Sequence, residues 1–142
     1  MPDIHYLNVD LDLESKASLC PLIEVFGDDV VVLHQSDCRD LCTASFEVTG
    51  SCSSGDAEWA ISRFCAFIEN LPPNARRLWD QCCSRVFDIG YESGDSPRCF
   101  RSILHPETVA RVASLGAAIM VTIYPPSMHE IGQDALPDGN GL

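Results

Sequence analysis

The first strand that the sequence predicts limits the possible folds more than any other segment, because its side chains alternate strictly. Residues 4–13 read IHYLNVDLDL. The apolar set is Leu7, Val9, Leu11 and Leu13, and the polar set between them is Asn8, Asp10 and Asp12. A period of two predicts a β-strand with one face in the core and the other outside it. The chain is therefore expected to build a sheet whose second face carries carboxylates.

Further predicted elements follow this strand in an alternating order. Helical spacing of apolar residues, with Gly or Pro at the ends, predicts helices near 18–26, 56–71 and 106–116 and a shorter helical piece at 74–83. Runs rich in apolar and β-branched residues predict strands at 29–35, 41–49, 84–94, 98–105 and 117–125. The last of these is apolar on both faces apart from Thr122, so we expect it at the centre of the sheet.

The resulting order β-α-β-β-α-β-β-α-β begins with the ferredoxin-like split βαβ pattern. It predicts an α+β fold in which a ferredoxin-like βαββαβ core is extended by a further β-α-β unit. The expected architecture is a two-layer sandwich, with a mixed sheet and the helices on one of its faces. The length of 142 residues suits one domain over residues 1–125. Residues 126–142 contain Pro, Gly and acids without periodicity, and they predict a flexible acidic tail.

The sequence also bears on the compartment. No apolar run approaches the roughly 20 residues that a transmembrane helix needs. The first residues lack the basic start and apolar stretch of a secretory signal. The chain holds eight cysteines at irregular spacing, in a domain large enough to fold without disulfides, so reduced thiols are expected. These features predict a cytoplasmic protein.

Charge is the strongest compositional signal. The formal net charge is −12, and residues 1–60 contribute most of it, with twelve acidic and two basic side chains. Such a field repels nucleic acid and anionic membranes and attracts basic protein surfaces. The same charge could also serve solubility alone, and this interpretation stays open.

One segment resembles a known family. The stretch LHPETVARVASLGAAIMVTIY, preceded by FDIGYESG, combines a Pro106-Glu107 helix start, a helix end at 113–117 and a final strand that closes in Tyr124. This arrangement resembles the end of a bacterial family of small domains of unknown function, numbered 4279. The resemblance implies an α+β fold and no assigned catalysis, and it transfers no active-site residue.

The stretch HQSDCRDLC, residues 34–42, resembles a reactive centre more than any other segment. If it forms a hairpin, His34, Cys38 and Cys42 could approach one Zn²⁺ ion. The spacing His-x₃-Cys-x₃-Cys is not a common zinc spacing, and the chain has no CxxC motif. A polar hairpin loop with Asp and Ser as turn residues is the simpler interpretation.

Acidic residues on the predicted strands form the candidate binding site. A ferredoxin-like order places the first strand between the third and the fourth, so carboxylates from all three would share the face opposite the helices. They are Asp10, Asp12, Glu47, Asp88 and Glu92. Such a group could bind a basic protein, hold Mg²⁺, act as an acid and base, or simply face solvent.

The motifs of common catalytic sites are absent from the sequence. It has no GxSxG, no P-loop and no GxGxxG, so no catalytic residue and no cofactor are assigned. Our first hypothesis is a non-enzymatic acidic interaction module with a basic protein partner. Its most concrete form is an immunity protein that neutralises a basic toxin such as a nuclease. The alternatives are a metal-dependent enzyme or metal-binding protein that uses the carboxylates, and a structural or regulatory domain.

Overall fold

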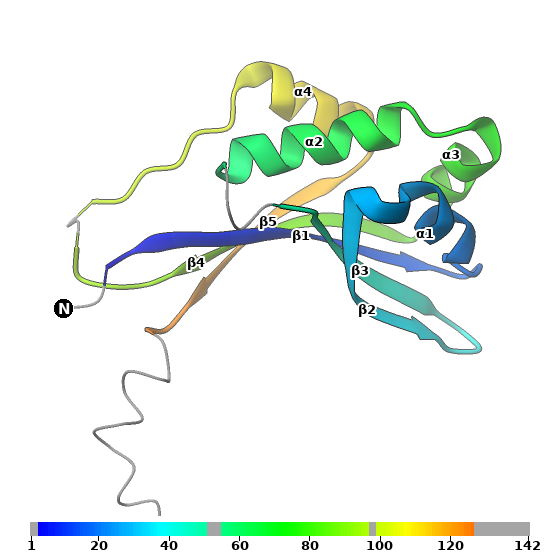
Figure 1. Ribbon diagram of the computed structural model, residues 1–142, viewed down its shortest axis with the longest axis horizontal. Helices are drawn as coiled ribbons and strands as arrows, with labels where there is room; N and C mark the ends of the chain where they lie inside the picture. The colour runs from blue at the N-terminus through cyan, green and yellow to red at the C-terminus, as the bar shows by residue number, and fades with distance from the viewer. Residues whose placement is uncertain (1–2, 51–54, 97–98, 127–142) are drawn as a thin grey trace, which may run out of the picture.

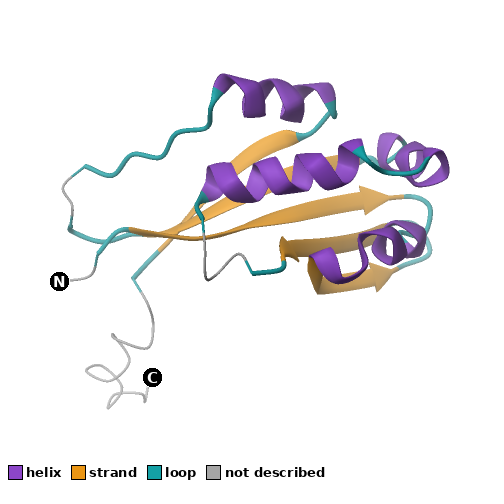
Figure 2. Cartoon of the chain, turned by 45° about the horizontal axis from the view of Figure 1, so that its top comes forward, coloured by secondary structure: helices purple, strands orange, loops and turns teal. Residues whose placement is uncertain are grey.

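The computed structural model of the chain describes residues 3–50, 55–96 and 99–126. These residues form an α+β fold with a five-stranded mixed sheet and four α-helices, and the helices lie on one side of the sheet (Figures 1 and 2). The strands are β1 (His5–Ser15), β2 (Val30–Asp37), β3 (Cys42–Val48), β4 (Ser84–Glu92) and β5 (Ala118–Tyr124). The helices are α1 (Cys20–Phe26), α2 (Ala57–Glu69), α3 (Pro73–Asp80) and α4 (Pro106–Ser114), and a short 3-10 turn spans Gly27–Asp29.

The strands run in the order β2-β3-β1-β4-β5 across the sheet. β1 pairs antiparallel with β3 on one side and with β4 on the other, and β2 pairs antiparallel with β3. β5 adds to β4 in parallel. The prediction that the first strand lies between the third and the fourth is therefore confirmed, and it decides which side chains become neighbours on the open face of the sheet.

The alternation of β1 divides its side chains as expected over most of its length. Val9, Leu11 and Leu13 are buried, at 0–1% exposure, under the helices. The prediction that Leu7 also points inward is wrong. The pairing with β4 shifts by one residue between Tyr6 and Asn8, so Tyr6 takes the inward place opposite Tyr91 and Leu7 is 36% exposed. Such a bulge reverses the alternation of the residues that precede it.

The helices begin and end where local chemistry predicts. Asp56 caps α2 by accepting a hydrogen bond from the backbone N–H of Trp59 at 3.0 Å. Proline stands in the first turn of α1, α3 and α4, where its missing N–H costs nothing. Together with the inward side of the sheet, these helices enclose the core. Its largest fully buried side chains are Trp79, Phe46, Phe64, Phe87, Leu11, Leu13, Leu19, Leu22, Ile61, Ile68, Val9 and Val48.

One arginine joins the end of α3 to the turn after α4. The guanidinium of Arg85 donates to the backbone carbonyls of Trp79, Asp80 and Cys82 and to that of Gly116, at 3.0–3.2 Å. The indole N–H of the fully buried Trp79 donates to the carbonyl of Leu115 at 3.0 Å. The last carbonyls of a helix lack partners further along it, so these bonds supply donors at both helix ends, although the Trp79 carbonyl also accepts from the backbone N–H of Cys82 at 3.1 Å.

Two predicted features of the C-terminal half are wrong. Residues 99–105 form no strand; Arg98, the first residue of that prediction, lies outside the described residues. Both sides of β4 are already occupied, by β1 and β5, so this segment cannot form a hairpin with the strand that precedes it. It instead crosses from β4 to α4, as a parallel connection requires (Figure 1). The predicted β-α-β extension of the core is therefore wrong in its first strand: only α4 and β5 follow β4.

The second error concerns the place of the last strand. We expected it at the centre of the sheet because it is apolar on both faces, but β5 is an edge strand. The predicted tail, apart from Pro126, lies outside the described residues.

Candidate functional site

Four carboxylates meet on the sheet face that the helices leave open. Asp10 and Asp12 come from β1, Glu47 from β3 and Asp88 from β4, and we call these four residues the carboxylate cluster. Asp10 lies directly opposite Asp88 in the β1–β4 pairing. The amide nitrogen of Asn8 donates to both Asp10 Oδ1, at 3.1 Å, and Glu47 Oε2, at 3.0 Å, and so links β1 to β3. Four of the five residues predicted for the binding face are thus brought together.

The other hydrogen bonds to the carboxylate cluster also come from uncharged groups. Ser45 Oγ donates to Asp12 Oδ1 at 2.8 Å, and Thr122 Oγ1 donates to Asp88 Oδ1 at 2.6 Å. Hydroxyl and amide donors orient the carboxylates without cancelling their charge. The cluster therefore has a defined geometry and an uncompensated negative potential, which is what a cationic group would meet on approach.

Burial and the neighbouring charges make Asp10 and Asp12 weaker acids than an ordinary aspartate. Burial of Asp10, followed by the nearby charges of Asp12, Glu47 and Asp88, raises the pKa of Asp10 to about 6. The pKa of Asp12 is also raised, mainly by burial, although its hydrogen bond from Ser45 opposes the shift. A positive charge placed against the cluster would lower both pKa values, so binding of a cationic surface should release protons near pH 6.

The raised pKa of Asp10 gives a stability prediction. The folded chain holds the Asp10 proton up to about pH 6, whereas an unfolded aspartate loses it near 3.8. Folding is therefore favoured at low pH, and that contribution is lost as the pH rises from about 4 to 6. We expect Asp10→Asn to be more stable than wild type at pH 7, by about 1 kcal/mol for a half-exposed group, and to show no such gain at pH 3.5. Urea unfolding across this pH range measures the difference.

Asp40→Asn is the control for this measurement, because Asp40 is an exposed residue of the loop between β2 and β3. It should follow the wild-type pH dependence. An Asp10→Asn variant whose stability runs parallel to wild type at every pH would contradict the interpretation.

Glu92, the fifth predicted residue, lies on the same face but at the far end of β4. It pairs across from His5, and the two side chains approach to 3.6 Å between Nε2 and Oε1. Gly90 separates it from Asp88 along the strand. Glu92 thus extends the acidic face toward the start of β1 and is not part of the carboxylate cluster.

The metal site considered for the β2–β3 hairpin is not supported by the geometry. His34 contacts Thr43 Oγ1 at 3.3 Å on the open face of the sheet. Cys42 is buried on the opposite, helix-covered face, and Cys38 lies in the loop near Ser36, at 3.5 Å between Sγ and Oγ. Across residues 3–50, 55–96 and 99–126, no group of three or more His, Cys, Asp and Glu side chains is arranged to hold a metal ion.

The helices on the other side of the sheet carry both positive and negative charge. Helices α2, α3 and α4 together carry four arginines and four acids, so their charges balance. Arg111 on α4 forms an ion pair with Glu69 on α2 at 2.9 Å, and Arg76 pairs with Asp80 along α3 at 3.2 Å. Arg85, although it belongs to β4, bonds to backbone carbonyls on the helix side. Helix α1 and the 3-10 turn after it add Glu24, Asp28 and Asp29 without a base, so acidic charge is present on both sides, but the four acids of the carboxylate cluster are gathered at one place on the open face.

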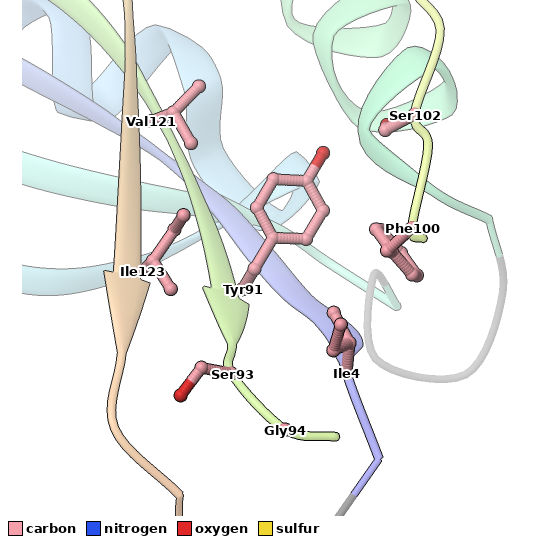
Figure 3. A pocket seen from close by; sticks show the side chains of 8 residues that line it. All are labelled: Ile4, Tyr91, Ser93, Gly94, Phe100, Ser102, Val121 and Ile123. Atoms are coloured by element: carbon pink, nitrogen blue, oxygen red, sulfur yellow. The ribbon is translucent and has the colours of Figure 1, made fainter. Parts of the chain in front are cut away.

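A pocket that sequence reasoning did not find lies at one end of the helix-covered side. It has a volume of about 470 Å³, and its wall is mainly apolar, from Ile4, Tyr91, Phe100, Val121 and Ile123 (Figure 3). The rings of Tyr91 and Phe100 contact edge to face, with centroids 5.5 Å apart. The pocket exists because residues 99–105 cross this end of the sheet without pairing to it. In the sequence, the only signal in this region was the apolar composition of residues 98–105, which we interpreted as a strand.

Polar groups surround the neighbouring hollow, which shares Tyr91 and Phe100 with the first pocket. The hydroxyl of Tyr6 lines it and has no hydrogen-bond partner among the described residues, and burial raises the pKa of this hydroxyl. The carboxylate of Glu58 forms the wall of the hollow near α4. It accepts from the backbone N–H of His105 at 2.9 Å and from Thr108 Oγ1 at 2.5 Å, so it is used in joining α2 to α4.

Comparisons with known proteins give this chain no relative. No family model, curated protein or solved structure matches it. The resemblance of the C-terminal segment to the numbered family of unknown function therefore stays a prediction, and the site must be interpreted from its own chemistry.

Two further observations concern the chain as a whole. The seven described cysteines, Cys20, Cys38, Cys42, Cys65, Cys82, Cys83 and Cys99, are free thiols; Cys52 lies outside the described residues. Within the part of the chain that the structure describes, no helix has the length and apolar character needed to cross a membrane.

Proposed function

We propose that this protein is a non-enzymatic interaction module whose open sheet face binds a basic protein. The observation that carries the proposal is the carboxylate cluster: four acids from three strands are oriented by uncharged donors, and burial of Asp10, together with the charges of the other three, raises its pKa to about 6. Repulsion among these carboxylates costs free energy, and the positive charge of a partner would offset that cost on binding.

The most concrete form of this proposal is an immunity protein that neutralises a basic toxin such as a nuclease. A nuclease cleft carries positive charge to bind phosphate, and an acidic surface of defined shape can occupy it. Complementary charge also speeds association, which suits a protein that must bind its toxin before damage occurs. The partner is a protein, with no role for nucleic acid or membrane, because the same field repels both.

Two features of the chain support further parts of this proposal. The strand order β2-β3-β1-β4, with antiparallel neighbours throughout, supports a ferredoxin-like core to which α4 and β5 are added. The free thiols support a reducing compartment, and we place the protein in the cytoplasm.

The test is to express the chain with basic proteins encoded beside its gene and to measure binding over a range of salt. A specific partner should bind tightly at low salt and more weakly as salt screens the contact. Replacing the cluster by Asp10→Asn, Asp12→Asn, Glu47→Gln and Asp88→Asn together should weaken binding on the order of 100-fold or more. For a nuclease partner, inhibition of DNA or RNA cleavage should be lost in parallel.

A second variant separates the cluster from net charge. Glu24→Gln, Asp28→Asn, Asp40→Asn and Asp95→Asn remove the same four charges from exposed positions outside the carboxylate cluster. This variant should bind nearly as well as wild type. The proposal fails if no basic partner binds, if binding ignores salt, or if both variants lose affinity equally.

A further inference from the structure

We propose that two copies of this chain associate through β5, edge to edge and antiparallel, so that the two sheets become one. This interface uses the outer edge of β5, whose Thr122 touches the carboxylate cluster through Asp88, but the pairing does not depend on what that cluster binds. The proposal starts from the exposure of β5. Ile119, Met120, Val121, Ile123 and Tyr124 are 38%, 44%, 55%, 65% and 47% exposed, and they come from both faces of the strand.

The surroundings of β5 are apolar as well. Val109 on α4 is 44% exposed, and Figure 1 shows α4 on the helix side of this edge of the sheet. Ile103, at 69%, and Phe100, at 38%, belong to the segment that leads into α4. Phe100 lines the same pocket as Val121 and Ile123, so exposed apolar side chains extend from β5 to this segment, and such exposure marks a site of association on a highly charged protein.

The edge is also unprotected against pairing. Natural edge strands are usually blunted by charged residues, proline or a bulge. β2, the opposite edge, has a register shift between Val32 and His34. β5 pairs with β4 without a shift over its whole length, and no charged or proline residue interrupts it. Its outer side therefore offers a strand of seven residues with no bulge in its pairing to β4.

The sequence of β5 identifies the occupant as a second copy. If two β5 strands pair antiparallel with Val121 opposite Val121, the side chains that meet across the pair complement one another. Ile119 would lie opposite Ile123, Met120 opposite Thr122 and Ala118 opposite Tyr124, which places β-branched residues together and a small residue against the largest one. A twofold axis at Val121 produces this closed pairing, the commonest form of protein dimer.

Charge favours the same occupant. Two copies that each carry −12 repel one another over most of their surfaces. Residues 112–126 contain no charged side chain, so this edge is where identical molecules can approach with the least repulsion. A basic partner would gain nothing here and would be drawn instead to the open face.

The test is the molar mass of the full chain in solution, measured by light scattering or sedimentation from low-micromolar to sub-millimolar concentration. Wild type should show a concentration-dependent dimer. Val121→Lys places two like charges at the twofold axis and should raise the dimer dissociation constant on the order of 100-fold or more. Val31→Lys is the matched control, because Val31 is an exposed valine of the other edge strand, at 47%. It should leave the dimer intact.

A second measurement covers the case in which the lysine variant folds poorly. In wild type, hydrogen exchange at the β5 amides should slow as concentration rises, while amides of β2 should not change. If wild type stays monomeric at every concentration, the inference is wrong, even if some other molecule binds β5. A dimer that Val31→Lys abolishes and Val121→Lys leaves unchanged would also overturn it.

Discussion

Replacing Trp79 with alanine should reduce the free energy of unfolding by about 3–5 kcal/mol, the cost of deleting a large buried aromatic side chain. Trp79 is fully buried at the end of α3, and its indole N–H donates to the carbonyl of Leu115 after α4. The substitution leaves a cavity and an unpaired carbonyl in the same place. Urea unfolding followed by circular dichroism gives the difference directly.

Trp79→Phe separates these two losses. It keeps most of the apolar volume but removes the indole N–H, so we expect a loss of about 1–3 kcal/mol from the unsatisfied carbonyl of Leu115. If the alanine variant lost less than the phenylalanine variant, Trp79 would not be the anchor between α3 and α4 that its contacts indicate.

Arg85→Ala should cost about 2–3 kcal/mol, a large effect for a side chain on the outer part of a strand. Its guanidinium contacts four backbone carbonyls: Nη1 is shared among those of Trp79, Asp80 and Cys82 around the end of α3, and Nε donates to that of Gly116. Alanine would leave these groups to compete for water at a partly buried junction. Because the guanidinium also lies 5.9 Å from the centre of the Trp79 ring, the effects of Arg85→Ala and Trp79→Ala should not add.

Two further variants test this explanation. Arg85→Lys keeps the charge, but a single ammonium cannot span carbonyls from two separate turns, so only part of the stability should return. Arg63→Ala is the surface control. Arg63 is exposed and stacks over Trp59 and Phe67, at 5.6 and 5.3 Å from the ring centres, and its loss should cost less than about 1 kcal/mol. Equal losses at both arginines would show that the carbonyl contacts are unimportant.

The sequence predicted most of the carboxylate cluster because a strand fixes its side chains with a period of two. Once the alternation of β1 placed Asp10 and Asp12 outside, the pairing with β3 and β4 brought Glu47 and Asp88 beside them. The same rule failed at Leu7, because a bulge is set by the tertiary pairing of two strands and leaves no mark in the composition of one of them.

The C-terminal half could not be predicted in the same way. An apolar strand has the same composition whether it is covered by the rest of its own chain or by another molecule, so β5 was placed at the centre of the sheet. Residues 99–105 have strand-like composition, but the predicted hairpin needs a free side of β4, and both of its sides are occupied by β1 and β5. The pocket between Tyr91, Phe100 and β5 follows from that crossing and was not predicted.

The gathering of acids at one place on the open face has a consequence at a distance. The carboxylate cluster gathers four acids on the open face, whereas the charges of α2, α3 and α4 balance, so the local field is strongly negative in front of the cluster and weak over those three helices. A cationic body entering this field experiences a torque as well as an attraction, so the two rotate into alignment before they touch. At physiological salt this guidance extends about 8 Å from the surface, roughly the length of one long side chain.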